Sequence, residues 1–153
     1  SDNFSNKVVS ICDVGSGAGF PGVVMAILNI EKKLNIKMVC IDSNSKKIEF
    51  LKHLVKALGL KIRIINSRVE EIEEKFDIIL ARAVAPLYKL FNYLENVSKN
   101  DTTFLLPKGK NWVLETYEIK KKWHYDLNVV KNNTLIDKSG GVTLMFRNVT
   151  RKK

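Results

Sequence analysis

Short apolar runs alternate with segments of helical periodicity along the first two thirds of the chain. Five runs have the length and composition of buried strands: Val8–Val14, Lys37–Ile41, Ile62–Ile65, Phe76–Ala81 and Thr103–Leu106. Three segments between them repeat apolar residues every three or four positions, which predicts helices: residues 23–30, 45–58 and 87–97. Because parallel neighbours need a crossover, this alternation predicts an open α/β fold, a mostly parallel sheet with helices on both faces.

The last third of the chain has a different pattern. A segment rich in Lys and Glu, Trp112–Trp123, is expected to be a helix, and two strands follow at Leu127–Val130 and Val142–Val149. The turn between them holds Ser139-Gly140-Gly141, and no helix fits there. We therefore expect an antiparallel hairpin to end an otherwise parallel sheet, unlike a symmetric dinucleotide-binding fold with six parallel strands.

Length and composition fit one globular domain over residues 1–153, since 45% of the residues are hydrophobic and 27% are charged. No apolar run reaches the roughly 18 residues of a membrane-spanning helix, and the first residues lack the order of a secretory signal. Cys12 and Cys40 lie in apolar runs without metal-ligand spacing, so we expect buried free thiols and no metal site. These features indicate a soluble cytoplasmic protein.

The chain is strongly basic, with 26 Lys and Arg against 16 Asp and Glu and a net charge of +10. Such a charge favours a polyanionic partner, and nucleic acid is the first candidate. A compositional origin stays open, because 21 of the basic residues are Lys, a bias that an AT-rich genome could impose. The run Lys120–Lys122 before Trp123 likewise fits either a basic patch with a stacking aromatic or a solvated face beside a packed tryptophan.

A glycine-rich segment, Gly15-Ser16-Gly17-Ala18-Gly19-Phe20, follows the first strand, and Pro21 then suits a first helical position. Open parallel sheets bind ligands at the carboxyl ends of their strands, where glycine lets the backbone approach a ligand closely. Phe20 stands where a dinucleotide-binding loop has its last glycine. We interpret the segment as a loop in which Gly15 and Gly17 contact a bound ligand. The alternative is a tight turn that binds nothing.

Asp42 ends the second strand, at the same edge of the predicted sheet. An acidic residue at this place can accept hydrogen bonds from the two ribose hydroxyls of an adenosine. Alternatively, Asp42 caps the next helix or is merely solvated. Ser45 is the expected N-cap of that helix and Gly59 its terminating glycine.

Five segments of the chain occur in the order and at the spacing of one known family. They are DVGSGAGFPG, IDSNSKKIEFLK, NSRVEEI, FDIILARAVAPL and LLPKGK, within residues 8–149. In them the chain resembles the bacterial guanine-N7 methyltransferases of small-subunit ribosomal RNA (RsmG, also called GidB). The resemblance implies a class I, Rossmann-like methyltransferase fold with a seven-stranded sheet whose last strand is antiparallel. It also implies S-adenosyl-L-methionine as donor and 16S rRNA as substrate. We expect that RNA to be in a 30S particle or its precursor, because a small domain gains specificity from RNA shape more than from base code.

The resemblance also assigns residues by their position in these segments. Gly15 and Phe20 match donor-binding residues of the first loop, and Val69 and Glu70 match the pair beside the adenine. Arg82 matches an arginine after the fourth strand, where a guanidinium can fork onto a donor carboxylate or an RNA phosphate. We expect Arg82 to be the catalytic residue, acting by orientation and charge; an ordinary salt bridge is the alternative.

No general base is expected, because guanine N7 carries a free lone pair and its methylation removes no proton. Catalysis should come from holding donor and acceptor in near-attack geometry. His53 and His124 are accordingly expected to be structural or solvated, the latter near the end of the Lys-rich helix.

Arg68, Lys108 and Lys110 are the candidate RNA contacts, because they are expected on the same rim and could position phosphates. A lysine in a loop is otherwise merely solvated. The family resemblance also implies a helical segment before the first strand that helps to cover the cleft and shape the RNA face, and the sequence before Val8 is too short to hold it.

Two other functions share part of this pattern. A nicotinamide-dependent (NAD) oxidoreductase would use the same glycine loop and Asp42, but Phe20 and the terminal hairpin argue against it. A non-catalytic RNA-binding or ribosome-binding module would keep the donor pocket without transferring a methyl group. We favour the methyltransferase, acting as a monomer and without a membrane partner.

Overall fold

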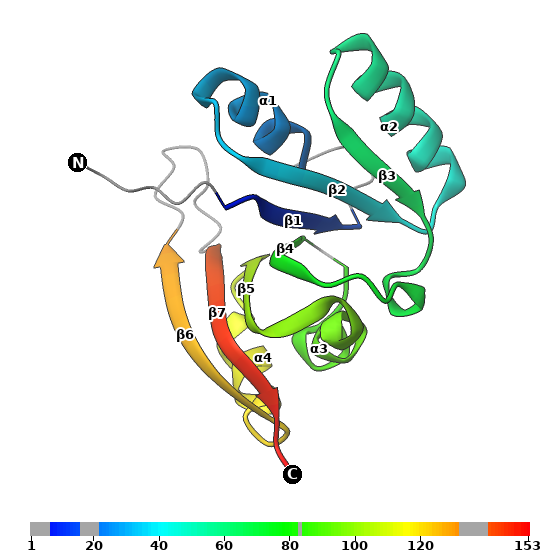
Figure 1. The fold of residues 1–153 in the computed structure, drawn as a ribbon. Coiled ribbons are helices and arrows are strands. Elements are labelled where there is room, and N and C mark those ends of the chain that lie inside the picture. The colour runs from blue at the N-terminus through cyan, green and yellow to red at the C-terminus, as the bar shows by residue number, and fades with distance from the viewer. Residues whose placement is uncertain (1–6, 16–21, 83, 132–140) are drawn as a thin grey trace, which may run out of the picture.

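The computed structural model describes residues 7–15, 22–82, 84–131 and 141–153. They form a seven-stranded sheet with strand order β3-β2-β1-β4-β5-β7-β6 (Figure 1). The strands are β1 (Val9–Val14), β2 (Ile36–Asp42), β3 (Ile62–Asn66), β4 (Phe76–Ala81), β5 (Ser98–Lys108), β6 (Trp123–Lys131) and β7 (Val142–Arg151). The helices are α1 (Gly22–Lys32), α2 (Ser45–Ala57), α3 (Leu87–Leu94) and α4 (Trp112–Ile119), with short 3-10 turns η1 (Val69–Glu71) and η2 (Glu95–Val97).

The sheet is parallel except at one edge. β1 pairs in parallel with β2 and β4, β2 pairs with β3, and β4 pairs with β5. β7 lies antiparallel between β5 and β6. The predicted α/β sheet and its terminal antiparallel hairpin are therefore confirmed. The strand order reverses between β1 and β4, which is the place where open parallel sheets bind ligands.

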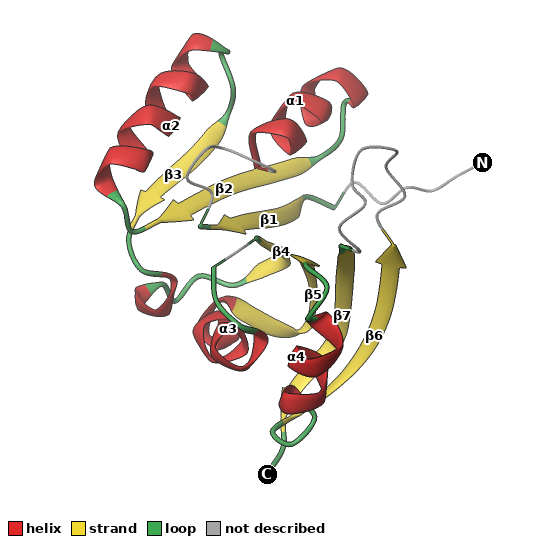
Figure 2. Ribbon diagram, turned by 180° about the vertical axis from the view of Figure 1, so that it is seen from behind, coloured by secondary structure: helices red, strands yellow, loops and turns green. Residues whose placement is uncertain are grey.

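Helices cover both faces of the sheet (Figure 2). α1 and α2 lie on one face, over a core that includes Ile11 and Leu80, and α3 and α4 lie on the other. The core under α3 is aromatic: the ring centroid of Phe91 lies 5.4 Å from that of Phe104 and 5.0 Å from that of Phe146, edge to face in both pairs. These two cores fix the strands so that their carboxyl ends meet at one edge.

Helix α2 begins beside the end of β2. The Asn44 side-chain oxygen accepts a hydrogen bond from the backbone N–H of Lys47 at 3.1 Å, so the N-cap is Asn44 and not Ser45. The Ser45 hydroxyl accepts a hydrogen bond from the Asn66 side chain instead. At the other end Gly59 takes φ +62°, a conformation that favours glycine, so its role as the terminating glycine is confirmed.

The C-terminal third differs from the prediction at Trp123. The helix expected over Trp112–Trp123 ends with α4, and Trp123 is the first residue of β6 and only 5% exposed. Its ring packs edge to face on Phe91 at a centroid distance of 5.5 Å, and the Arg151 guanidinium lies over its face at 4.4 Å. Lys120–Lys122 therefore form a turn, and Trp123 is a packed residue whose face is already covered.

Several smaller expectations are settled by the same structure. Cys12 and Cys40 are buried free thiols, as predicted. His53 is exposed in α2, but His124 is an exposed residue of β6 and not of a helix. The helix expected over residues 87–97 is α3 followed by η2. Ser139 and Gly140 of the expected turn lie outside the described residues.

None of the helices described is long and apolar enough to cross a membrane. Nor do the residues that the structure describes bring together three or more His, Cys, Asp or Glu side chains that could hold a metal ion.

Candidate functional site

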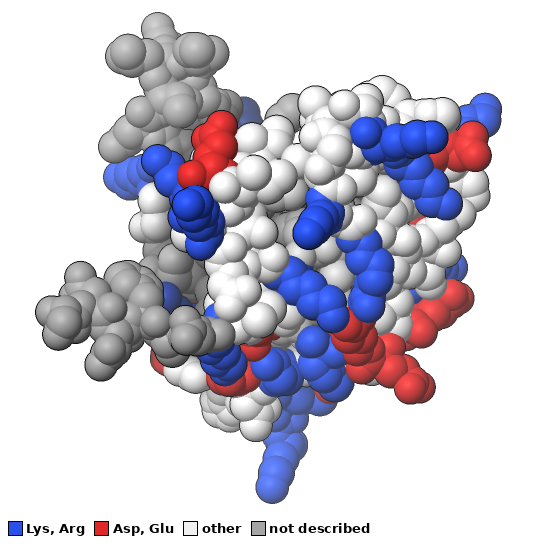
Figure 3. Space-filling model, turned by 45° about the horizontal axis from the view of Figure 1, so that its top comes forward, with Lys and Arg blue, Asp and Glu red and all other residues white. Residues whose placement is uncertain are grey.

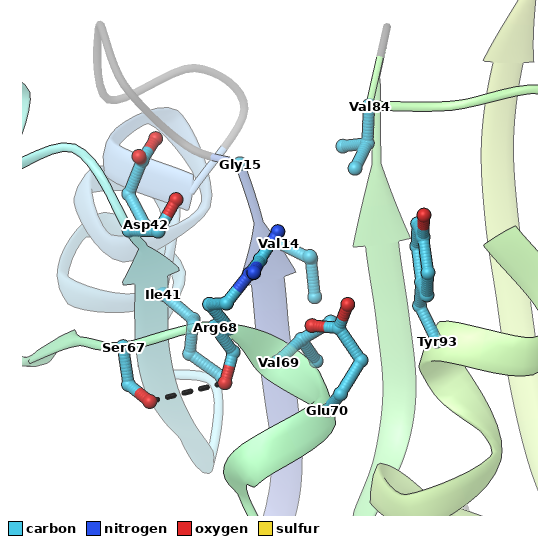
Figure 4. Close-up of a pocket in the computed structure, with 11 residues that line it drawn as sticks. Val14, Gly15, Ile41, Asp42, Ser67, Arg68, Val69, Glu70, Val84 and Tyr93 are labelled. Carbon is cyan, nitrogen blue, oxygen red and sulfur yellow. Dashed lines mark hydrogen bonds between the residues drawn. The ribbon is translucent and has the colours of Figure 1, made fainter.

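A pocket of about 280 Å³ opens at the carboxyl ends of the parallel strands (Figure 4). The residues that line it are Val14, Gly15, Ile41, Asp42, Ser43, Ser67, Arg68, Val69, Glu70, Val84 and Tyr93. Its volume is near the lower end of the range for small-molecule sites, roughly 300 to 1,000 Å³. Apolar side chains of the sheet lie beside two carboxylates, so the pocket suits a ligand that is partly a flat ring and partly polar.

Gly15 forms the wall of the pocket at the end of β1. Its backbone takes φ +72°, and its N–H donates to the Ile41 carbonyl at 2.8 Å. A Cβ placed on Gly15 would lie 2.7 Å from Cγ2 of Val84, so this position has both the conformation and the close approach that require glycine. Gly17 and Phe20, the other predicted residues of the loop, lie outside the described residues and stay predictions.

Asp42 borders the pocket at the end of β2, as expected from the sequence. Its Oδ1 accepts a hydrogen bond from the backbone N–H of Asn44 at 2.8 Å, which holds the carboxylate at the start of α2. The Ser67 N–H donates to the Asp42 carbonyl at 3.1 Å and ties the end of β3 to the same place. The expected role near the helix start is therefore real, and ribose binding by this carboxylate stays a prediction.

The turn η1 forms a third wall. Val69 is buried and Glu70 borders the pocket, and the Asn96 side chain donates to the Glu70 carbonyl at 2.9 Å. Arg68, predicted as an RNA contact, also lines the pocket, and its side chain extends toward Val14 in Figure 4. The structure thus brings the predicted Val69 and Glu70 together with Gly15 and Asp42 around one cavity.

Arg82 follows β4 directly, with an exposed side chain that is not among the described residues lining the pocket. A role for its charge in the site stays a prediction. Asp13 is 1% exposed, and its Oδ2 accepts the backbone N–H of Gly22 at 2.8 Å. Burial raises the pKa of Asp13 to about 7, against the lowering effects of the Gly22 N–H and the Arg82 guanidinium.

The Asp13 pKa predicts a pH dependence of stability. Between the ordinary carboxyl pKa of 3.8 and about 7, the folded state keeps a proton that the unfolded state has lost, so this carboxyl makes stability fall as pH rises through that window. Asp13→Asn keeps an oxygen acceptor for Gly22 and cannot ionise. The free energies of unfolding of the variant and the wild type are measured in urea. We expect the variant to become more stable relative to the wild type as pH rises from 4 to 7, and the difference between the two to stay constant above pH 7. A difference that does not change with pH would contradict the assignment.

Lys108 and Lys110, the other predicted RNA contacts, differ in their surroundings. Lys110 is exposed. The Lys108 amino group is largely covered and donates to the Ala85 carbonyl at 2.9 Å and to Glu115 Oε1 at 3.1 Å. RNA contact by either residue stays a prediction. The hydrogen bonds of Lys108, however, go to other groups of the protein.

Six residues that line the pocket are not among the sequence-based predictions of the site: Val14, Ile41, Ser43, Ser67, Val84 and Tyr93. Val84 lies in the segment FDIILARAVAPL, so the family resemblance offered a signal for it. Tyr93 comes from α3, and its hydroxyl points toward Val84 in Figure 4. Its position in the sequence carried no signal, because only the packing of α3 against the sheet brings it to the pocket.

This strand order, with a pocket at the strand ends and a left-handed glycine after β1, defines a class I S-adenosylmethionine-dependent methyltransferase. Solved structures of this fold include a SAM dependent methyltransferase from Aquifex aeolicus, with a TM-score of 0.64 and 20% identity over 94% of this chain and 85% of that chain. The family model of rRNA small subunit methyltransferase G (GidB) matches residues 1–140. The chain belongs to this family.

Other relatives agree with this assignment. Ribosomal RNA small subunit methyltransferase G of Rickettsia prowazekii is 36% identical over 147 residues, which are 96% of this chain and 72% of that protein. The Zymomonas mobilis protein of the same name is 42% identical over 118 residues, 76% of this chain and 51% of that protein. M. jannaschii TYW2, solved in complex with AdoMet, shares the fold with a TM-score of 0.68 and 16% identity over 97% of this chain and 72% of that chain.

Proposed function

We propose that this chain, as a single monomeric methyltransferase domain in the cytoplasm, transfers a methyl group from S-adenosylmethionine to N7 of a guanosine in 16S rRNA within a 30S particle or its precursor. The observation that carries the proposal is the convergence of Gly15, Asp42, Val69 and Glu70 on one pocket at the strand ends. These residues come from three separate segments of the family pattern, and the chain belongs to that family.

The described residues fit the donor. Gly15 has no Cβ, and this leaves room between the end of β1 and Val84. Val14, Ile41 and Val69 offer apolar surface to a flat ring, and the Asp42 carboxylate is held at the rim, where ribose hydroxyls can donate to it. Bound S-adenosylmethionine supplies an electrophilic methyl group, and the protein supplies its position.

The reaction requires little acid–base chemistry from the protein. Guanine N7 has a free lone pair, so no side chain has to remove a proton before it attacks. Orientation is then the main contribution, and effective molarities on the order of 10⁵ M or more are available from it. Arg82, next to the pocket at the end of β4, supplies a fixed positive charge for a donor carboxylate or an RNA phosphate.

The charge distribution supports an RNA partner. On the face shown in Figure 3, Lys and Arg side chains are spread widely, and Asp and Glu side chains stand in separate groups among them, at the upper left, the upper right and the lower right. A net charge of +10 suits a large folded polyanion, and specificity then comes from RNA shape more than from base edges. Arg68 and Lys110 are the described cations that we assign to RNA contact.

Asp42→Asn is expected to lower affinity for S-adenosylmethionine about tenfold, because an amide is a weaker acceptor for two hydroxyls than a carboxylate, and charge-assisted hydrogen bonds contribute roughly 1.5–3 kcal/mol. Calorimetric titration of both proteins measures the difference. Asp126→Asn, in β6 and far along the sheet, is the matched control, and its donor affinity should equal that of the wild type. Equal affinity in Asp42→Asn would remove this carboxylate from the donor site.

The proposal as a whole is tested by methyl incorporation. Ribosomal particles from cells that lack the endogenous enzyme are incubated with the chain and donor labelled in the methyl group, and the labelled nucleotide is mapped. We expect label at N7 of one guanosine of 16S rRNA. Donor binding without methyl transfer to any ribosomal particle would favour the non-catalytic module. Thermal stabilisation by NAD and not by S-adenosylmethionine would favour the oxidoreductase.

A further inference from the structure

The segment that joins β4 to α3 borders the pocket through Val84. Cγ2 of Val84 lies where a side chain of Gly15 would begin, so the position of this segment sets the width of the pocket. The same segment starts with Arg82. Anything that fixes the backbone between Val84 and Leu87 therefore acts on this wall of the pocket.

Two side chains from other elements hold this backbone. Lys108, the last residue of β5, donates from Nζ to the Ala85 carbonyl at 2.9 Å and to Glu115 Oε1 at 3.1 Å. Glu115, in the first turn of α4, accepts the backbone N–H of Leu87 on the same oxygen, at 3.1 Å. The ion pair thus binds one backbone group on each side of Pro86, the Ala85 carbonyl and the Leu87 N–H.

Pro86 explains why α3 needs a hydrogen-bond acceptor from another element at its N-terminus. It is the N-cap residue of α3, and its carbonyl accepts the N–H groups of Lys89 and Leu90, but it has no side-chain acceptor for the N–H groups before them. Glu115 supplies that acceptor for Leu87 and places a negative charge at the helix N-terminus, where the helix dipole favours it. The N-cap residue of α3 has no side-chain cap, and the acceptor for the first N–H of the helix belongs to Glu115, 28 residues farther along the chain.

The ion pair is also poorly solvated. The side chains of Lys108 and Glu115 are 11% and 21% exposed, whereas those of the surface pair Arg151 and Glu95 are 43% and 45% exposed. Salt and water screen a covered pair less than an exposed one. Loss of either partner leaves the other charge under-compensated and releases a backbone group, so both partners are needed.

We propose that Lys108 and Glu115 are positioning residues of the donor site, which hold Val84 in place for S-adenosylmethionine, and that Lys108 does not act by touching RNA. The proposal rests on the proposed function, since it assumes that the pocket takes the donor. It separates Lys108 from its neighbour Lys110, which is exposed and stays a predicted RNA contact.

The two charges allow a direct test. Lys108→Met and Glu115→Gln are compared with the wild type by calorimetric titration of S-adenosylhomocysteine, by binding to 30S particles, and by steady-state methylation. A positioning pair predicts that both variants change in the same direction. Each should lose about tenfold in donor affinity and show a raised KM for the donor, while affinity for the particles stays within about twofold. Lys108→Arg keeps a cation in reach of Glu115 and should restore most of the donor affinity.

A stability control separates positioning from folding. Thr102 is buried in β5, and its hydroxyl donates at 2.6 Å to the carbonyl of Phe76, the first residue of β4, at the end of that strand away from the pocket. Thr102→Ala should lower the melting temperature and leave donor affinity unchanged. If Lys108→Met fails to fold, the nearly isosteric Glu115→Gln carries the test.

Three outcomes would overturn the proposal. If Lys108 touches RNA, Lys108→Met weakens particle binding, Glu115→Gln leaves or strengthens it, and donor affinity stays normal. If the pair is only structural, both variants melt earlier, as Thr102→Ala does, but bind the donor normally. A wild-type chain that does not bind S-adenosylhomocysteine defeats the proposed function itself, and that result is distinct from normal wild-type binding with unaffected variants.

Discussion

Gly15→Val is expected to lower affinity for S-adenosylmethionine by about 10- to 100-fold. A β-branched residue at φ +72° costs on the order of 1–3 kcal/mol, and a backbone that relaxes to relieve this strain leaves the conformation that the pocket needs. Restoring that conformation on binding costs the same energy, and each 1.4 kcal/mol is a factor of ten in affinity. The added Cβ would also start 2.7 Å from Cγ2 of Val84, so either the loop or the β4–α3 segment has to move. Both movements change the pocket wall, and calorimetric titration with the donor measures the loss.

Gly59→Val is the matched control. Gly59 has nearly the same backbone conformation, φ +62°, but a Cβ there would meet nothing within 4 Å, and the residue lies beyond the far end of α2. This variant should lose stability from the same strain and bind the donor like the wild type. Unchanged donor affinity in Gly15→Val would remove Gly15 from the site.

Arg82→Ala is expected to lower kcat/KM for methyl transfer by about 10- to 100-fold, because charge-assisted hydrogen bonds of a guanidinium contribute roughly 1.5–3 kcal/mol. The side chain is exposed, so the free energy of unfolding should change by no more than about 0.5 kcal/mol. Steady-state methylation of 30S particles and urea unfolding measure the two effects.

The control for Arg82 removes the same charge elsewhere. Arg63, on β3, forms an exposed ion pair with Glu74, and such pairs contribute about 0–1 kcal/mol. Arg63→Ala should keep normal turnover. An equal loss in both variants would mean that only the total charge matters, and full activity of Arg82→Ala would place the residue outside the site.

The fold was largely accessible from the sequence because buried parallel strands are continuous apolar runs. Phe76–Ala81 is predicted with its observed limits, and the hairpin follows from the lack of room for a helix between β6 and β7. The same reasoning was wrong at Trp123, which was predicted in a helix and begins β6. Its neighbours Lys120–Lys122 suit a helix, but packing of the indole on Phe91, far away in the sequence, starts a strand there instead.

The site was accessible where strand ends or family segments mark it. Asp42 and Gly15 each follow a strand, and Val69 and Glu70 lie in a segment of the family pattern. Contacts between elements that are distant in the sequence could not be predicted in this way. The pairing of Lys108 with Glu115 depends on how α4 returns to the end of β5, and a pattern of single residues does not encode it.

The central claim is that the pocket at the strand ends seats the methyl donor. A crystal structure of the chain with S-adenosylhomocysteine tests it most directly. We predict the adenosine between Gly15 and Glu70, with its ribose hydroxyls within hydrogen-bonding distance of the Asp42 carboxylate. A pocket filled by the protein's own side chains, with the ligand elsewhere or unbound, would contradict the claim.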